Sequence, residues 1–381
     1  MFSFRTTELK RQEDILLNKG NISFICNQSS WNPEIREYPF EEFSRRGNLV
    51  SVFVPSGDTL NHHPLSSKIP FKSIKRDING YAFNIEDFAK TDAIIVEMQD
   101  AGCRYFGAPN LTANLITFLH NADSTLPLYI VDRPNPSGRL VEGTPLTAGY
   151  RSGFGVETVP HRYGLTLGEL AYYVYQRIGA KFPLHIISSK CSPISKLVMP
   201  WSIPLAENYG NFFTSAFYTG QYLWKATNIS NAEGTIRPYE MFGAPFLQDV
   251  DFESHSLFKD EGVYVRWCSF IPHSGLHKER VCFGYQLLLT PQNQYHELSH
   301  ALRLIRCAND LSTAFQFNKT EEGQDCSMAE MLIGDKELLD FTQGKLSWDE
   351  VKEHIKLEEQ KWIKKAKKFL LYEEEPLFRI K

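Results

Sequence analysis

The stretch LPLYIVDRPNPSGRLVEG (residues 126–143) says most about the fold of this chain. Its apolar run ends abruptly at Asp132 and Arg133, which is typical of a buried strand that delivers two charges at its carboxyl end. Two prolines flank Asn135, fix φ on both sides and remove two backbone donors, so we expect a stiff loop. Stiff polar loops at strand ends are where α/β proteins place their chemistry. The alternative is a structural Asp132–Arg133 ion pair that braces a proline-rich turn.

The first half of the sequence alternates short apolar runs with helical patterns. The apolar runs cover residues 21–26, 48–54, 92–98, 126–131 and 183–188, and the helical patterns cover residues 6–19, 39–46, 84–90, 109–121 and 166–179. Such alternation predicts βαβ units. We therefore expect an α/β fold with a Rossmann-like, mostly parallel sheet and helices on both of its faces. Thr166 and Glu169 have the spacing of a capping box, which assigns Glu169 a structural task.

The second half follows a different pattern. Residues 195–250 are irregular and rich in aromatic side chains, most of which we interpret as packing rather than sugar stacking. Antiparallel strands are expected within residues 267–289, a helix within 293–311, and helices over the last fifty residues. The sequence thus predicts a Rossmann-like N-terminal domain over 1–225 and an α+β domain over 226–381.

Composition and spacing exclude several classes of function. The net charge is −4 with acids and bases interspersed, so we expect no nucleic-acid partner. No run reaches the ~18 apolar residues of a membrane-spanning helix, which predicts no membrane insertion. Seven cysteines without a CxxC pair, histidines without zinc spacing and no glycine-rich phosphate loop predict neither metal nor cofactor. The N-terminal residues lack a signal-peptide pattern, so we expect a cytoplasmic location.

Polar side chains follow each of the expected strands. They are Asn27 and Gln28 after the first, Asp58 after the second, Gln99 and Asp100 after the third, and Asp132 and Arg133 after the fourth. The carboxyl ends of parallel strands converge on one crevice. A crevice of carboxylates, amides and an arginine without phosphate-binding machinery suits a hydroxyl-rich ligand such as a sugar.

These segments, taken in order, resemble the NamZ-type exo-β-N-acetylmuramidases, bacterial enzymes long classed as a domain of unknown function. The matching pieces are ICNQSS, VEMQDAGCRYF, VDRPNPSGRLVEGTPL, RYGLTLGELA, TNIS, EGT, YEMFGAPF and a C-terminal W…FLLY, and they extend from about residue 22 to 372. The resemblance implies two domains with a cleft between them. It also implies an amino-sugar or muropeptide ligand, from which terminal N-acetylmuramic acid is released.

The family pattern extends to individual positions. It implies site roles for Gln99, Asp100, Arg104, Asp132, Arg133, Asn135, Glu142, Arg162 and Asn228. Tyr163 stands where the family has a histidine, Lys225 where it has a glutamate, and Glu233 where it has an arginine.

The largest departure follows the second strand. The family has Pro-Glu-His-Gly there, and its glutamate is the best acid/base candidate. This chain has Pro55, Ser56, Gly57 and Asp58 instead. We therefore expect weak or altered glycosidase activity, or, as the alternative, an inactive paralogue that binds amino sugars. Oligomeric state is left open.

Glycoside hydrolysis usually needs two carboxyl groups, one of which carries a raised pKa. The catalytic candidates are Asp58, Asp100 and Glu142. The substrate-binding candidates are Asn27, Gln28, Gln99, Arg104, Asp132, Arg133, Asn135, Arg162, Tyr163 and Asn228. The structural alternative pairs Asp100 with Arg104 and Asp132 with Arg133.

Overall fold

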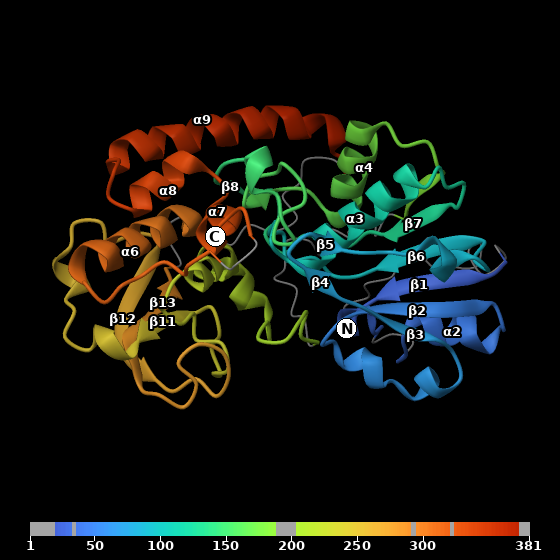
Figure 1. The fold of residues 1–381 in the computed structure, drawn as a ribbon, viewed down its shortest axis with the longest axis horizontal. Helices are drawn as coiled ribbons and strands as arrows, with labels where there is room; N and C mark the ends of the chain where they lie inside the picture. Colours follow the sequence, from blue (N-terminus) through green and yellow to red (C-terminus); the bar gives the residue numbers. More distant parts are fainter. Residues whose placement is uncertain (1–19, 33–35, 188–202, 291–294, 321–323, 373–381) are drawn as a thin grey trace. The chain divides into compact units, whose positions relative to one another are not determined.

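The computed structural model describes residues 20–32, 36–187, 203–290, 295–320 and 324–372, which form two compact units (Figure 1). Unit 1 contains the residues up to Arg139, Gly164–Asn211 and a C-terminal segment that starts at Ala366. Unit 2 contains Leu140–Tyr163 and Phe212–Lys365. Residues 140–163 and 212–225 thus group with unit 2, so the units do not coincide with the expected domains, and the domain boundary at 225/226 stays a prediction.

Unit 1 is built on a six-stranded sheet in which every pairing is parallel, which confirms the predicted α/β class. In spatial order the strands are β10 (Leu184–Ile187), β7 (Leu128–Val131), β6 (Ala93–Glu97), β1 (Ile22–Cys26), β2 (Leu49–Pro55) and β3 (Phe71–Ile74). Five of them match the predicted strands. The edge strand β3 was not predicted, because its sequence FKSI is short and half polar.

Helices cover both faces of this sheet, as predicted. They are α2 (Pro39–Arg45), α3 (Gly107–Asn121) and α4 (Leu167–Ile178). Phe40 and Phe43 of α2 pack in one core cluster with Ile187 of the sheet. On the opposite face, a Cβ placed on Gly168 of α4 would lie 2.6 Å from Ile186 Cγ2. Because neighbouring strand residues point to opposite faces, α2 and α4 lie on different sides.

Two of the helices predicted for unit 1 are not seen as α-helices in the described residues. The pattern over 84–90 forms only a 3₁₀ turn, Ile85–Phe88, because strand β6 begins too soon afterwards for a longer helix. The helix expected over 6–19 lies outside the described residues. The capping box at α4 is confirmed, since Glu169 N donates to Thr166 Oγ1 at 3.2 Å and Thr166 N donates to Glu169 Oε2 at 2.9 Å. A small hairpin of β4 (Arg76–Asp77) and β5 (Gly80–Tyr81) completes the unit.

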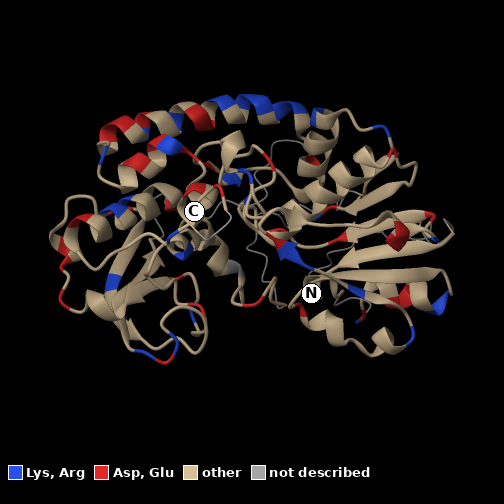
Figure 2. Ribbon diagram, viewed as in Figure 1, with Lys and Arg blue, Asp and Glu red and all other residues tan. Residues whose placement is uncertain are grey.

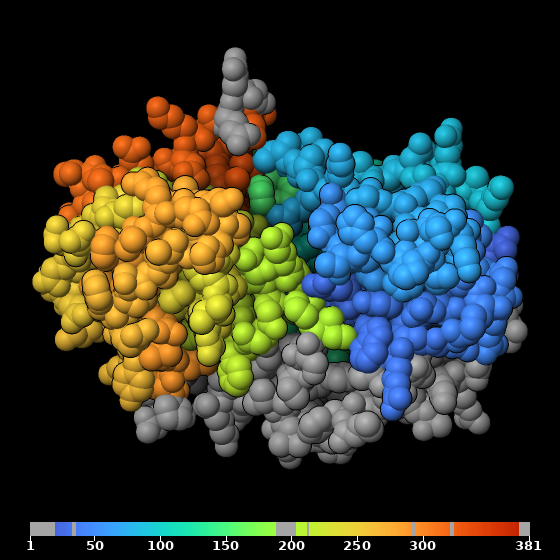
Figure 3. Space-filling view, turned by 90° about the horizontal axis from the view of Figure 1, so that it is seen from below, coloured from blue at the N-terminus to red at the C-terminus, as the bar shows by residue number. Residues whose placement is uncertain are grey.

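Unit 2 contains two small antiparallel sheets. One pairs β8 (Val141–Glu142) with β9 (Arg162–Tyr163). The other has the order β11 (Met241–Ala244), β13 (Cys282–Leu289), β12 (Val263–Phe270), so the antiparallel prediction is confirmed. The connection between β12 and β13 forms part of the surface in Figure 3. Ile271 and Leu276 of this connection are exposed.

The helices of unit 2 are α5 (Tyr218–Gln221), α6 (Glu297–Leu311), α7 (Met328–Ile333), α8 (Lys336–Thr342) and α9 (Trp348–Ala366). The predicted helix within 293–311 and the helices predicted over the last fifty residues, as far as these are described, are confirmed. Figure 2 shows basic residues along the second half of α9, while Trp362 of the same helix is buried. These basic residues are exposed, so they form a solvated face of the helix. Among the described residues, no helix combines the length and apolar character that crossing a bilayer requires.

The aromatic side chains around residues 209–242 serve mainly as packing, as predicted. Trp224 is fully buried and stacks on Phe242 with ring centroids 4.8 Å apart. Tyr218, Tyr222 and Tyr239 are also buried and contact one another. Phe213 differs, because 59% of it is exposed.

Candidate functional site

The turns after strands β1, β6 and β7 of unit 1 are tied together by Ser29. The Asn27 side-chain oxygen accepts from the Ser29 amide at 3.2 Å and also from the Ser29 hydroxyl. Ser29 Oγ accepts from the backbone N–H of Gln99 at 3.1 Å, and Ser29 O accepts from Arg133 Nη1 at 2.8 Å. The carboxyl ends of the strands therefore form one hydrogen-bonded edge, as the parallel topology predicts.

Asp58 joins the same edge from the end of β2. Gln28 N donates to Asp58 Oδ2 at 3.1 Å, and Leu60 N donates to Asp58 Oδ1 at 3.0 Å. The carboxylate thereby caps the 3₁₀ turn Thr59–His62. Partial burial raises the pKa of Asp58, and the two backbone N–H donors oppose this rise. Asp58 is half-buried, so one carboxyl group with a raised pKa lies at this edge within reach of solvent.

Arg133 pairs with a residue that was not assigned a site role. Its Nη2 lies 2.6 Å from Glu97 Oε1, at the end of the neighbouring strand β6. The Asp132–Arg133 ion pair considered as a structural alternative is therefore wrong. Adjacent residues of an extended chain point to opposite sides, whereas Glu97 lies across the β6–β7 pairing.

Asp132 is fully buried and faces α4 rather than solvent. Oδ2 accepts from the hydroxyls of Thr166 at 2.6 Å and Tyr372 at 2.7 Å. Oδ1 accepts from the amides of Gly168 at 2.8 Å and Arg133 at 3.0 Å. Burial raises the pKa of Asp132 to about 6 despite these donors. With both oxygens engaged inside unit 1, Asp132 stabilises the fold, and its substrate-binding role stays a prediction.

The other side chains of this edge are also buried. Gln99 Nε2 donates to the carbonyls of Asp100 at 3.0 Å and Pro134 at 2.8 Å. Asn135 Nδ2 donates to Leu165 O at 2.8 Å. Asp100 and Arg104 are each 2% exposed, and the Arg104 guanidinium lies 5.8 Å from the centre of the Tyr105 ring. The proline-rich loop is therefore braced by its own Asn135 and by Gln99 from the turn after β6.

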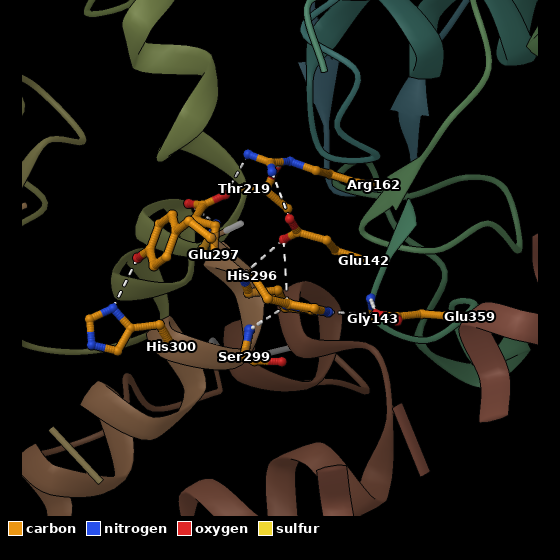
Figure 4. Close-up of polar contacts among 12 residues, drawn as sticks. Glu142, Gly143, Arg162, Thr219, His296, Glu297, Ser299, His300 and Glu359 are labelled. Carbon is orange, nitrogen blue, oxygen red and sulfur yellow. Dashed lines mark hydrogen bonds and ion pairs between the residues drawn. The ribbon is translucent and has the colours of Figure 1, made fainter. Parts of the chain in front are cut away.

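Glu142 and Arg162 meet in unit 2, in the hairpin of β8 and β9 (Figure 4). Arg162 Nη1 donates to Glu142 Oε1 at 2.8 Å, and Arg162 Nη2 donates to Glu297 Oε2 at 2.8 Å. Arg162 Nε donates to Thr219 Oγ1 at 3.1 Å. All three charged side chains are at least 97% buried. One buried guanidinium therefore forms ion pairs with two buried carboxylates.

Glu297 is the first residue of helix α6. Burial raises the pKa of Glu297 to about 8, and the charge of Glu142 adds to the rise, while Arg162 lowers it. Its Oε1 accepts from the amides of Gly220 and Gln221. Glu297 thus anchors α6 to α5.

His296 is the accessible member of the network, with 36% of its side chain exposed. Its Nε2 lies 2.8 Å from Glu359 Oε1, and its Nδ1 accepts from Ser299 N at 3.2 Å and lies 3.7 Å from Glu142 Oε2. Burial alone lowers the pKa of His296, but the Glu142 and Glu359 carboxylates outweigh this effect and raise it above its ordinary value. His300, by contrast, is fully buried, and burial lowers its pKa to about 4.

The remaining candidates of unit 2 support local structure. Tyr163 is fully buried, and its carbonyl accepts from Trp362 Nε1 at 2.8 Å. The Asn228 side chain ties down the segment 314–316, through Ala314 O at 2.7 Å and Gln316 N at 3.0 Å. Lys225 and Glu233, whose charges are opposite to those of the family pattern, form an ion pair with each other at 2.8 Å.

Sequence reasoning missed the partners that orient the predicted residues. They are Ser29 and Glu97 for Arg133, Thr166 and Tyr372 for Asp132, and Glu297 and His296 for Glu142 and Arg162. Glu97 carried a signal, since it is a charge at the end of an apolar strand. The other partners lie far away in sequence, so pattern alone did not reveal them.

The predicted site residues fall into both units. Asn27, Gln28, Asp58, Gln99, Asp100, Arg104, Asp132, Arg133 and Asn135 belong to unit 1, and Glu142, Arg162, Tyr163 and Asn228 belong to unit 2. The common cleft stays a prediction. Within the described ranges, no three His, Cys, Asp or Glu side chains gather in a way that could hold a metal ion.

Comparisons with known proteins find family models that match both the N-terminal and the C-terminal part of the chain. The family model for the N-terminal part of the exo-β-N-acetylmuramidase NamZ matches residues 67–197, and the model for its C-terminal part matches residues 216–372. The peptidoglycan β-N-acetylmuramidase NamZ of Bacillus subtilis (strain 168) is 28% identical over 233 residues, which are 59% of this chain. The match spans only 55% of the length of that relative.

Two crystal structures share the fold. Both are of DUF1343 family proteins from Bacteroides fragilis NCTC 9343, and each is 21% identical to this chain. The TM-scores are 0.74 and 0.77, with 96% of this chain covered and 98% and 97% of the other chains.

Proposed function

Because the chain belongs to the NamZ family of exo-β-N-acetylmuramidases, we propose that it is a glycosidase that releases terminal N-acetylmuramic acid from peptidoglycan fragments. The observation that carries the proposal is the match of both family models, which together extend from residue 67 to 372. The hydrogen-bonded edge of carboxylates and amides in unit 1 supports it, because such groups suit a hydroxyl-rich ligand.

Asp58 is the proposed general acid. A glycosidase needs a carboxylic acid that stays protonated long enough to protonate the leaving oxygen. Partial burial raises the pKa of Asp58 in this direction, and the side chain remains accessible. Gly57 precedes it with φ +86°, and a Cβ placed on Gly57 would have no neighbour within 4 Å, so this side of the turn is open.

The second carboxylate is Asp100 or Glu142. Asp100 shares unit 1 with Asp58 and follows β6. Glu142 lies in unit 2, where Arg162 and the amide of Leu298 occupy its two oxygens. Both oxygens of Glu142 are therefore already engaged within unit 2, whereas Asp100 lies in the same unit as Asp58.

Hydrolysis of a chromogenic N-acetylmuramide by the wild type and by Asp58→Asn tests this assignment. We expect weak activity in the wild type and a further loss of about 10²–10⁴-fold in the variant, the usual contribution of a general acid. Asp58→Asn keeps one oxygen that can cap the turn through the Leu60 amide but loses the acceptor for the Gln28 amide, so the unfolding of the variant is measured beside its activity. Full activity in Asp58→Asn would contradict the assignment and make Glu142 the next candidate.

The second candidate function is a non-hydrolysing protein that binds amino sugars. One observation favours it. Gln99, Asp132 and Asn135 of the family motifs form hydrogen bonds within unit 1 that stabilise the fold. Isothermal calorimetry with N-acetylmuramic acid separates the two functions. Binding without detectable hydrolysis of the chromogenic substrate would favour the second.

A further inference from the structure

Arg133 is the arginine of the strand-end edge that a ligand can reach. Its side chain is 18% exposed, whereas Arg104 is only 2% exposed. A guanidinium has five N–H donors. Arg133 donates one hydrogen bond to Glu97 Oε1 and one to Ser29 O. Within the described part of the chain, its other side-chain N–H groups contact no acceptor. Arg133 therefore has donors left for a ligand.

Two acceptors set the orientation of this guanidinium, and a third hydrogen bond holds the backbone of the same residue. Glu97, whose side chain is 3% exposed, accepts at 2.6 Å from the end of β6. Ser29 O accepts at 2.8 Å from the turn after β1. The backbone of Arg133 is held by its own N–H, which donates to the buried Asp132. A side chain fixed in this way loses little conformational freedom when it binds a ligand.

N-acetylmuramic acid differs from N-acetylglucosamine by a lactyl ether that ends in a carboxylate. The planar fork of an arginine matches the two oxygens of a carboxylate better than any other side chain does. We propose that Arg133 binds the lactyl carboxylate and thereby selects muramyl over glucosaminyl residues, with Glu97 and Ser29 as its positioning partners. The inference rests on the proposed function for the identity of the sugar.

The surrounding charges limit how strong this recognition is. Glu97 neutralises part of the Arg133 charge, and Asp58 places a second carboxyl group at the same edge. Attraction must therefore come from direct N–H contacts rather than from a long-range positive field. Hydrogen bonds between charged partners typically change affinity by about 10- to 100-fold. We expect selectivity within that range.

The test compares two ligands by calorimetry on the full chain: N-acetylmuramic acid and its lactyl methyl ester. The ester keeps the sugar and the ether but lacks the negative charge. The wild type should bind the acid about 10- to 100-fold more tightly than the ester. Equal affinity for the two, or binding of neither, would overturn the inference.

Two variants locate the effect. In Arg133→Ala the ratio of acid to ester affinity should fall close to one, with ester affinity nearly unchanged. In Glu97→Gln the ratio should fall while the ester still binds, because the guanidinium keeps its charge but loses its orientation. A merely structural role for Glu97 would weaken both ligands equally.

Arg139→Lys is the matched control. Arg139 is also 18% exposed in unit 1 and also pairs with a buried glutamate, Glu169, but its guanidinium uses both terminal nitrogens on that partner. The ratio should stay at the wild-type value in this control. An undiminished ratio in a folded Arg133→Ala would overturn the inference.

The outcome is distinguishable from that of the proposed function. Selective binding of the acid without hydrolysis would support the proposed role of Arg133 and contradict the proposed glycosidase activity. The opposite outcome is hydrolysis of the chromogenic N-acetylmuramide with the same KM in Arg133→Ala as in the wild type. It would support the glycosidase activity and contradict the role of Arg133.

Discussion

The Tyr372 hydroxyl donates a 2.7 Å hydrogen bond to Asp132 Oδ2 across a sequence separation of 240 residues. The neighbouring amide of Leu371 donates to Glu169 Oε1 at 2.9 Å. The segment that starts at Ala366 is therefore fastened to the end of β7 and to the first turn of α4, all within unit 1. The aspartate of the family motif thus joins two distant parts of one unit.

Tyr372→Phe should destabilise unit 1, because it removes one donor from a fully buried carboxylate. We expect the free energy of unfolding to drop by about 1–3 kcal/mol above pH 7, where Asp132 is charged. The pKa of Asp132 is about 6, so the carboxyl group is mostly protonated at pH 5 and the loss should shrink there. Urea unfolding at the two pH values measures both effects. An equal loss at pH 5 and pH 7.5 would contradict this account.

Gly102→Ala should be far more harmful than Gly47→Ala. Both glycines have a positive φ, +72° and +77°, so each alanine pays a similar cost of about 1–2 kcal/mol for the left-handed region. A Cβ on Gly102 would in addition overlap Asn135 Oδ1, while nothing lies within 4 Å of one on Gly47. The difference in melting temperature between the two variants measures the cost of the overlap with Asn135. Similar melting temperatures would show that the loop of Asn135 yields easily.

Arg162→Met should lower the free energy of unfolding by about 3–5 kcal/mol, because it leaves Glu142 and Glu297 buried without their cation. Adding Glu297→Gln should recover part of this loss, since burial already disfavours that charge. Arg45→Ala, which breaks an ion pair between side chains 60% and 20% exposed, is the control and should change stability little. Denaturant titration gives all three values. No recovery in the double variant would show that Arg162 acts mainly through Thr219 and the backbone.

The sheet of unit 1 was predictable because its central strands are continuous apolar runs separated by helical patterns. Phe24, Ile95 and Ile130 lie in such runs and are at most 1% exposed. The edge strand β3 was missed because Lys72 and Ser73 give it no apolar period. The grouping of residues 140–163 with unit 2 was not predictable, because it depends on the pairing of β8 with β9 and not on a local signal.

The site was predictable as a set of strand-end residues but not as a set of contacts. That Asp132 and Arg133 follow a buried strand is visible in the sequence. That Arg133 pairs with Glu97, while Asp132 accepts from Thr166 and Tyr372, depends on strand order and on a segment 240 residues away. Alternation along an extended chain explains why the two neighbours do not pair with each other.

His296→Asn should change how stability depends on pH. Asparagine can still cap helix α6, so the variant removes the titrating imidazole while keeping an acceptor for the amide of Ser299. The charged groups that act on the ring are Glu142, Glu359 and Arg162. Glu297 also titrates in this range but is present in both chains, so the difference between them reports mainly on His296.

The sign follows from linkage. The pKa of His296 is raised above its unfolded value of about 6.5, so the folded chain binds the proton more tightly than the unfolded chain does. The stability that His296 contributes is then fully present below pH 6.5 and is lost as the pH rises through the folded pKa. Urea unfolding of both chains from pH 5.5 to 9 should show the wild-type advantage falling with pH above 6.5. An advantage that is constant or that grows over this range would show that the carboxylates of Glu142 and Glu359 do not stabilise the imidazolium.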